Sequence, residues 1–220
     1  MDQSDSITEL ALKAVESIKS LGDAEKVGQV QRYFKETVKS YGVSAREVRQ
    51  VAAEIYKDKK NKWKENEILR FCELLLKDPH VEIKSMAGVL MAHFSSELSP
   101  GAFFRIRSWL EADLCDNWAA VDTLCPNTMG LLLKKHPELL LKIKEWAFSP
   151  NRWVRRASLV SFIKPAKDKN YHPEEEGVVS QRDTSSPGHI KKAGFEFIVF
   201  IEFVAFIGFF TSVSKRSFEA

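Results

Sequence analysis

The stretch VEIKSMAGVLMAHF, residues 81–94, decides the fold class of this chain. Its apolar residues recur three and four positions apart, which places them on one face of an α-helix. Similar apolar stripes lie on both sides of it, and proline-containing dipeptides separate one stripe from the next. Because proline cannot continue a helix but suits the first turn of the next one, each dipeptide predicts a chain reversal. The predicted reversals are Asp78-Pro79, Ser99-Pro100, Cys125-Pro126, His136-Pro137 and Ser149-Pro150.

Apolar stripes of this kind recur through the first part of the chain and predict one helical domain over residues 1–169. No segment shows the alternation of polar and apolar residues that marks a β-strand. Ser6 with Glu9 and Ser44 with Glu47 have the spacing of a capping box, which predicts two helix starts. Helix pairs that recur at roughly 35–40 residues favour an all-α helical-repeat solenoid. A compact, irregular helical bundle is the competing architecture.

The composition changes beyond this domain. Residues 170–192 combine prolines, a glutamate run and serines, which predicts a polar linker. Residues 193–220 form a hydrophobic tail, whose phenylalanine-rich run 195–213 is about long enough to cross a bilayer. Glu196 and Glu202 interrupt that run. Three interpretations of the tail stay open: a membrane anchor, a helix packed on the solenoid, or residues with no selected structure.

The overall charge is mildly basic. A net charge of +3 permits a nucleic-acid partner without demanding one. Residues 151–169 hold six cations and one acid, which indicates either a basic binding surface or a solvated helix end. The polar, acidic N-terminus predicts an intracellular protein without a signal peptide.

The cysteines and histidines do not have the spacing of a zinc site, so no metal is expected. The cysteines lie in apolar helical contexts, which predicts buried thiols in a reducing compartment. They are Cys72, Cys115 and Cys125.

Candidate chemistry lies in the stretch NWAAVDTL and, further along, in NRWVRRA. On a helix Trp118 and Asp122 are four positions apart and share a face, and Trp153 and Arg156, three apart, do the same. Aromatic rings, a carboxylate and a guanidinium on one surface suit a cationic, planar, phosphate-linked substrate, such as a damaged nucleotide in DNA. The alternatives are core packing of the two tryptophans and a purely structural Asp122–Arg156 ion pair.

These stretches belong to a wider set of motifs. The most specific elements are W-x-x-x-D and, after it, an arginine inside W-x-x-R-A. With these motifs the chain resembles the AlkD-like DNA alkylation repair glycosylases, which are built from HEAT-like repeats, over about residues 25–182. The motifs that carry the resemblance are Tyr33-Phe34-Lys35, Tyr41-Gly42-Val43-Ser44, Glu47-Val48-Arg49, Lys62-Trp63 with Glu67, Glu82-Ile83-Lys84-Ser85-Met86-Ala87, Asn117-Trp118-Ala119-Ala120-Val121-Asp122, His136-Pro137-Glu138 and Asn151-Arg152-Trp153-Val154-Arg155-Arg156-Ala157.

The resemblance implies a function. A member of this family hydrolyses the N-glycosidic bond of N3- or N7-alkylated purines in double-stranded DNA, as a monomer and without a metal or cofactor. By the same resemblance the catalytic residue is Asp122, the substrate-binding residues are Trp118 and Trp153, and the DNA-phosphate-binding residues are Arg156, Arg155 and Arg152.

The sequence departs from the family pattern near Arg182, where further helices and another DNA-facing aromatic residue are expected. This departure favours a truncated or alternatively spliced product. Two other functions follow as alternatives: a non-catalytic helical-repeat interaction scaffold, and an inactive form that associates with a membrane through residues 195–213.

Overall fold

The computed structural model describes residues 3–167, so the predicted linker and tail lie outside the described residues. Within them the chain forms nine α-helices, three short 3-10 helices and no β-strand, which confirms the predicted all-α helical-repeat fold. In this range no helix is long and apolar enough to cross a bilayer. The helices are α1 (Gln3–Ser20), α2 (Ala24–Gln31), α3 (Ala45–Lys59), α4 (Glu65–Leu76), α5 (Val81–His93), α6 (Gly101–Glu111), α7 (Trp118–Lys135), α8 (Leu140–Trp146) and α9 (Arg152–Val160), with 3-10 turns at Ser95–Glu97, Pro137–Leu139 and Pro165–Lys167.

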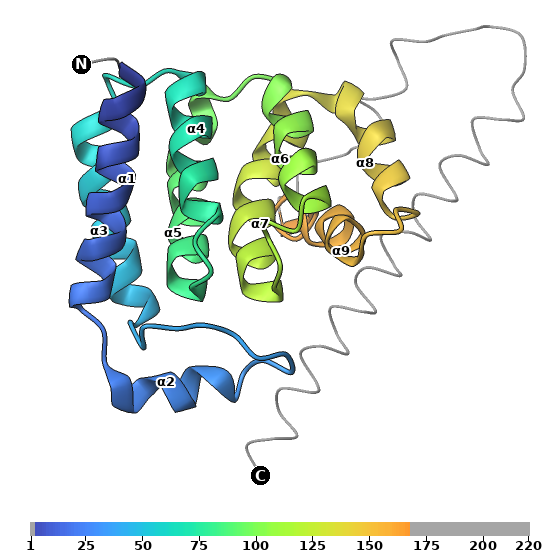
Figure 1. The fold of residues 1–220 in the computed structure, drawn as a ribbon. Coiled ribbons are helices and arrows are strands. Elements are labelled where there is room, and N and C mark those ends of the chain that lie inside the picture. The colour runs from blue at the N-terminus through green and yellow to red at the C-terminus, as the bar shows by residue number, and fades with distance from the viewer. Residues whose placement is uncertain (1–2, 168–220) are drawn as a thin grey trace, which may run out of the picture. The chain divides into compact units, whose positions relative to one another are not determined.

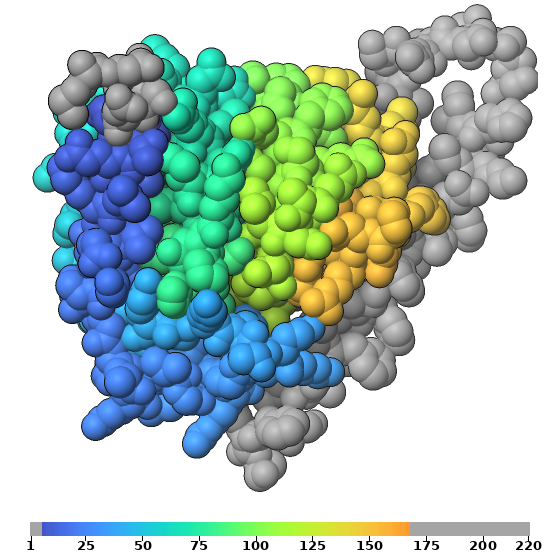
Figure 2. All heavy atoms as spheres, in the orientation of Figure 1, coloured from blue at the N-terminus to red at the C-terminus, as the bar shows by residue number. Residues whose placement is uncertain are grey.

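Most of the helices stand side by side in two layers (Figure 1). One layer contains α1, α4 and α6, and the other contains α3, α5 and α7. Helix α5 contacts α3, α4 and α7, while α9 packs against α6, α7 and α8. Helix α2 lies crosswise below the upright helices, and the chain that follows it extends toward α9, as the space-filling view also shows (Figure 2). The N-terminal part of the domain therefore reaches the helices that carry the candidate residues.

The predicted apolar stripes form the core between the layers. Every predicted core position of residues 81–94 is buried, and so are those of residues 103–110 in α6. All three cysteines are buried as predicted, and burial raises the pKa of the Cys115 thiol to about 12. The predicted core positions of residues 81–94 are Val81, Met86, Ala87, Leu90 and Met91 in α5 and Phe94 directly after it.

Of the two helix starts predicted from capping boxes, one is confirmed and one is wrong. Ser44 accepts a hydrogen bond from the backbone N–H of Glu47, whose carboxylate accepts from the Ser44 N–H, so the capping box of α3 is confirmed. The capping box at Ser6 and Glu9 is wrong, because α1 begins at Gln3 and Ser6 lies inside the helix. The capping-box spacing of a serine and a glutamate three residues later also occurs by chance inside a helix. It marks a helix start only where the serine itself is not helical.

Four of the five predicted reversals separate helices, but the one at Cys125-Pro126 is wrong. Pro126 lies inside α7, where an interior proline costs about 3 kcal/mol. The residues around it are buried, among them Leu124 and Met129, so core packing outweighs the local preference. Because proline has no N–H, the carbonyl of Asp122 receives no helical hydrogen bond from residue 126.

Helices α5 and α7 meet at Gly88. A Cβ atom placed there would lie 2.9 Å from the backbone nitrogen of Leu124 and 3.0 Å from Cγ2 of Thr123. Only glycine allows this approach without a shift of one helix, so Gly88 fixes the spacing between the two helices.

Substitution of Gly88 tests that spacing. Gly88→Ala should lower the free energy of unfolding by about 1–3 kcal/mol, because the added methyl group overpacks the helix contact. The matched control is Gly28→Ala in α2, where a Cβ would meet nothing within 4 Å. That variant should gain about 0.5–1 kcal/mol from helix propensity. Urea denaturation measures both, and equal effects of the two substitutions would contradict the packing argument.

Candidate active site

Asparagine N-caps begin the two helices that carry the predicted residues. The Asn117 side chain accepts a 3.0 Å hydrogen bond from the backbone N–H three residues further on. Asn151 accepts from the second and third N–H groups of α9, at 2.8 and 3.2 Å. These caps place Trp118 and Asp122 in the first two turns of α7 and Arg156 in the second turn of α9.

Asp122 and Arg156 form a bidentate ion pair. Nε of Arg156 donates to Oδ1 of Asp122 at 2.7 Å, and Nη2 donates to Oδ2 at 2.5 Å. The two side chains are 30% and 36% exposed, so the pair is open to solvent on one side. The hydrogen bonds to the carboxylate raise the pKa of the Arg156 guanidinium. This geometry fixes both carboxylate oxygens in one orientation.

The two predicted tryptophans have different environments. Trp118 is 37% exposed and stacks on Phe34, with 5.2 Å between the ring centroids. Trp153 is 8% exposed, and the guanidinium of Arg152 lies over its ring at 4.3 Å from the centroid. Trp118 thus presents its indole to the surface, whereas Trp153 forms part of the floor beneath Arg152.

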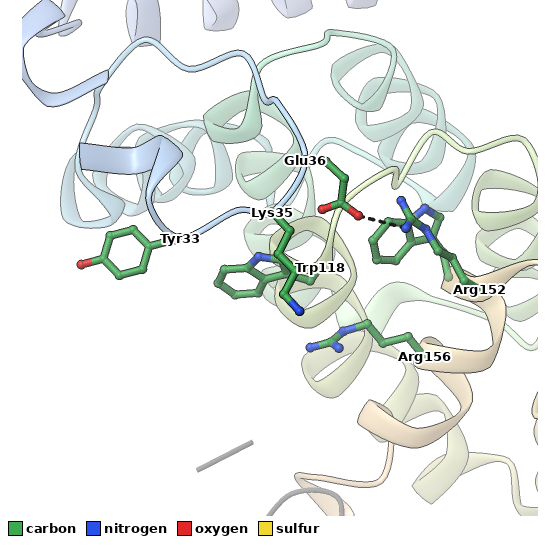
Figure 3. A pocket seen from close by; sticks show the side chains of 7 residues that line it. Tyr33, Lys35, Glu36, Trp118, Arg152 and Arg156 are labelled. Carbon is green, nitrogen blue, oxygen red and sulfur yellow. Dashed lines mark hydrogen bonds and ion pairs between the residues drawn. The ribbon is translucent and has the colours of Figure 1, made fainter. Parts of the chain in front are cut away.

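A pocket of about 450 Å³ opens beside Trp118 (Figure 3). In this view the Arg156 side chain extends toward Lys35, which lies in front of the Trp118 ring. Asp122 faces a neighbouring groove of about 320 Å³, which Trp118 also lines. The lining of the first pocket consists of Tyr33, Lys35 and Glu36 from the segment after α2, Trp118 from α7, and Arg152, Trp153 and Arg156 from α9.

The arginines of α9 are all held by partners within the protein. Arg152 donates to the carboxylate of Glu36 at 2.9 Å. Arg155 donates to the backbone carbonyls of residues 149 and 150 at 2.6 and 2.8 Å, and it does not line the pocket. In the structure Arg152 and Arg156 therefore line the pocket, whereas Arg155 contacts the backbone just before α9.

A family model described as DNA alkylation repair enzyme matches residues 14–186. The chain belongs to this family. The match confirms the resemblance seen in the sequence and extends slightly beyond it at both ends. Comparison with curated proteins gave no significant match.

The sequence pattern gave no role to the segment after α2. Phe34 covers one face of Trp118, and Glu36 holds Arg152. Lys35 lines the pocket and has no ion-pair partner among residues 3–167. The signal was present as an aromatic and basic cluster in Tyr33-Phe34-Lys35, but it lacks the periodicity of a helix and so pointed to no face.

The part of the chain that the structure describes has no evident metal centre. No group of three or more His, Cys, Asp or Glu residues is placed there to hold an ion. The charged groups that line the pocket are instead the Glu36 carboxylate and the cations of Lys35, Arg152 and Arg156. They surround the exposed indole of Trp118. Such a site can bind a cation against the indole and anions on its rim.

A double-mutant cycle measures the strength of the Asp122–Arg156 ion pair. Asp122→Asn, Arg156→Gln and the double variant should show a coupling free energy of about 1 kcal/mol in favour of the native pair, because the contact is bidentate and partly shielded. The exposed pair Glu9–Lys13 on α1 is the control and should couple by about 0.3–0.5 kcal/mol or less. Urea denaturation of each variant gives these values. Zero coupling between Asp122 and Arg156 would rule out a stable ion pair in solution.

Proposed function

We propose that the protein hydrolyses the N-glycosidic bond of N3- and N7-alkylated purines in double-stranded DNA. Membership of the DNA alkylation repair family supports repair of alkylated DNA. The observation that carries the finer proposal is the Asp122 carboxylate, which Arg156 orients within one helical turn of the exposed Trp118. A helical-repeat scaffold without chemistry has no need of such an arrangement.

The chemistry of the substrate determines what the site must supply. An N3- or N7-alkylated purine carries a positive charge, so it is already a good leaving group. Cleavage then needs a negative charge near the sugar, where oxocarbenium character develops, and an oriented water molecule. A carboxylate has about four lone-pair positions. Arg156 occupies two on Asp122, so the others can accept from water and face the sugar.

The aromatic residues provide the complementary surface for the base. A cationic purine is attracted to the face of an indole, with a gain of about 0.5–2 kcal/mol. Trp118 offers an exposed edge and face beside the pocket, while Phe34 keeps the ring in place. Trp153 supports Arg152 from below and so contributes to the substrate side indirectly.

The arginines of α9 bind the DNA backbone in this proposal. A guanidinium has five N–H donors. Arg156 uses two of its donors on Asp122, and Arg155 uses Nη1 on backbone carbonyls, so both retain donors for a phosphate. Arg152 exchanges the Glu36 carboxylate for a phosphate, since both are anionic oxygen acceptors. None of these contacts reads a base sequence.

Asp122→Asn tests the catalytic role. The variant should release methylated purine about 10²–10³-fold more slowly, because it loses the counter-charge for the transition state. Affinity for DNA should stay near the parental value, since the phosphate contacts remain. The assay measures free base released from DNA containing N-methylated purines, with Asp58→Asn on α3 as a surface control. Parental release by Asp122→Asn would exclude Asp122 as the catalytic group.

The salt dependence of DNA binding separates phosphate contacts from internal ion pairs. Arg156→Ala should shallow the slope of log affinity against log salt by about 0.9, the contribution of one phosphate. Arg152→Ala should do the same. Arg107→Ala on α6, whose partner is Glu111 in its own helix, is the control and should leave the slope unchanged. An unchanged slope for Arg156→Ala would mean that Arg156 serves only Asp122.

A further inference from the structure

Lys84 of α5 is a buried cation outside the candidate site. Its side chain is 5% exposed, and its ammonium group donates to the backbone carbonyls of Leu76 at 3.1 Å and Leu114 at 2.6 Å. It also lies 3.3 Å from Oδ1 of Asp116. Burial of a charge is costly unless partners surround it, so a lysine here needs a reason beyond filling space.

The partners of Lys84 lead to the start of α7. Oδ1 of Asp116, which faces the ammonium, also accepts a 3.0 Å hydrogen bond from Nδ2 of Asn117. Asn117 is the N-cap of α7, and its other side-chain atom, Oδ1, accepts from the N–H of Ala120. A continuous series of polar contacts therefore joins α5 to the first turn of α7, where Trp118 lies.

A second contact from the same face of α5 lies one turn further on. Gly88, four residues after Lys84, touches α7 at Thr123 and Leu124. The polar contact holds the helix before Trp118, and the glycine contact holds it directly after Asp122. Together the two contacts position the stretch of α7 that carries Trp118 and Asp122.

We propose that Lys84 is a positioning residue for base release. Through Asp116 and Asn117 it fixes the first turn of α7, and with it the places of Trp118 and Asp122 relative to the DNA. The inference rests on the proposed function in one respect, since it takes Asp122 as the catalytic group. A lysine that only caps the ends of α4 and the loop before α7 would stabilise the whole domain and affect no region in particular.

Three variants separate these roles. Lys84→Met keeps a similar length and removes the donors. Asp116→Ala breaks the series of contacts at a side chain that is 51% exposed, so it carries the test if Lys84→Met does not fold. Lys135→Met is the matched control, because Lys135 lies at the far end of α7 and donates to the carbonyl of Ser96 at 3.1 Å.

Amide hydrogen exchange reports on the first turns of α7 and does not depend on an activity assay. The backbone N–H groups of residues 120–122 should exchange about tenfold faster in Lys84→Met and in Asp116→Ala, the effect expected for a weakened N-cap. Exchange in α1 and α3 should match the parental protein. Lys135→Met should change nothing at residues 120–122.

The rate of base release measures the consequence for the reaction. At saturating enzyme both variants should release methylated purine between about tenfold and about 100-fold more slowly, because a shift of about 1 Å costs that much, while the dissociation constant for DNA stays the same. The double variant should be no slower than either single one, because both break the same series of contacts. Asn117→Ser, which keeps a capping oxygen, should retain more activity than Asn117→Ala.

Each result bears on the inference. Parental exchange at residues 120–122 in Lys84→Met and Asp116→Ala would overturn it, and so would faster exchange spread evenly over the domain. If the parental protein itself releases no base, the proposed function fails. In that case exchange at residues 120–122 still decides whether Lys84 positions the turn.

Discussion

The close contact between α5 and α7 at Gly88 is the constraint on which the candidate site depends. Because Gly88 has no side chain, α5 lies directly against the backbone of α7 and the methyl group of Thr123, so the two helices set each other's position. Helix α5 also holds the segment that forms the other side of the pocket beside Trp118. Its buried Glu82 accepts hydrogen bonds from the backbone N–H groups of residues 41–43, at 3.0 to 3.3 Å. These residues end the segment whose Phe34 covers Trp118, so one helix positions both sides of the pocket.

The sequence was sufficient for the fold class because the core is built from local periodicity. The apolar positions predicted within residues 81–94 are all buried in the structure, although burial also extends to Glu82 and Lys84 on the rest of the helix. Local signals failed where tertiary packing decides. Pro126 is tolerated within α7 because buried neighbours outweigh its cost, and the capping-box spacing at Ser6 falls inside α1. A single sequence contains no measure of that packing.

The candidate site was predictable within helices and not between distant segments. The spacing of Trp118 and Asp122 placed them on one face of α7, but only the family resemblance joined Asp122 to Arg156. The stacking of Phe34 on Trp118 joins segments 84 positions apart, and the Glu36–Arg152 ion pair joins residues 116 positions apart. No periodic pattern predicts such contacts. Arg155 shares a motif with Arg156, yet the carbonyls before α9 draw it away from the pocket.

The burial of the cysteines has a consequence for a member of a DNA alkylation repair family. Electrophiles that methylate purines also react with cysteine, and the reactive form is the thiolate. All three thiols of this chain are buried, and burial raises the pKa of each, that of Cys115 to about 12. Cys125 lies only three positions after Asp122 and is fully enclosed. All three thiols are therefore held in the protonated form, which reacts with electrophiles far more slowly than a thiolate does.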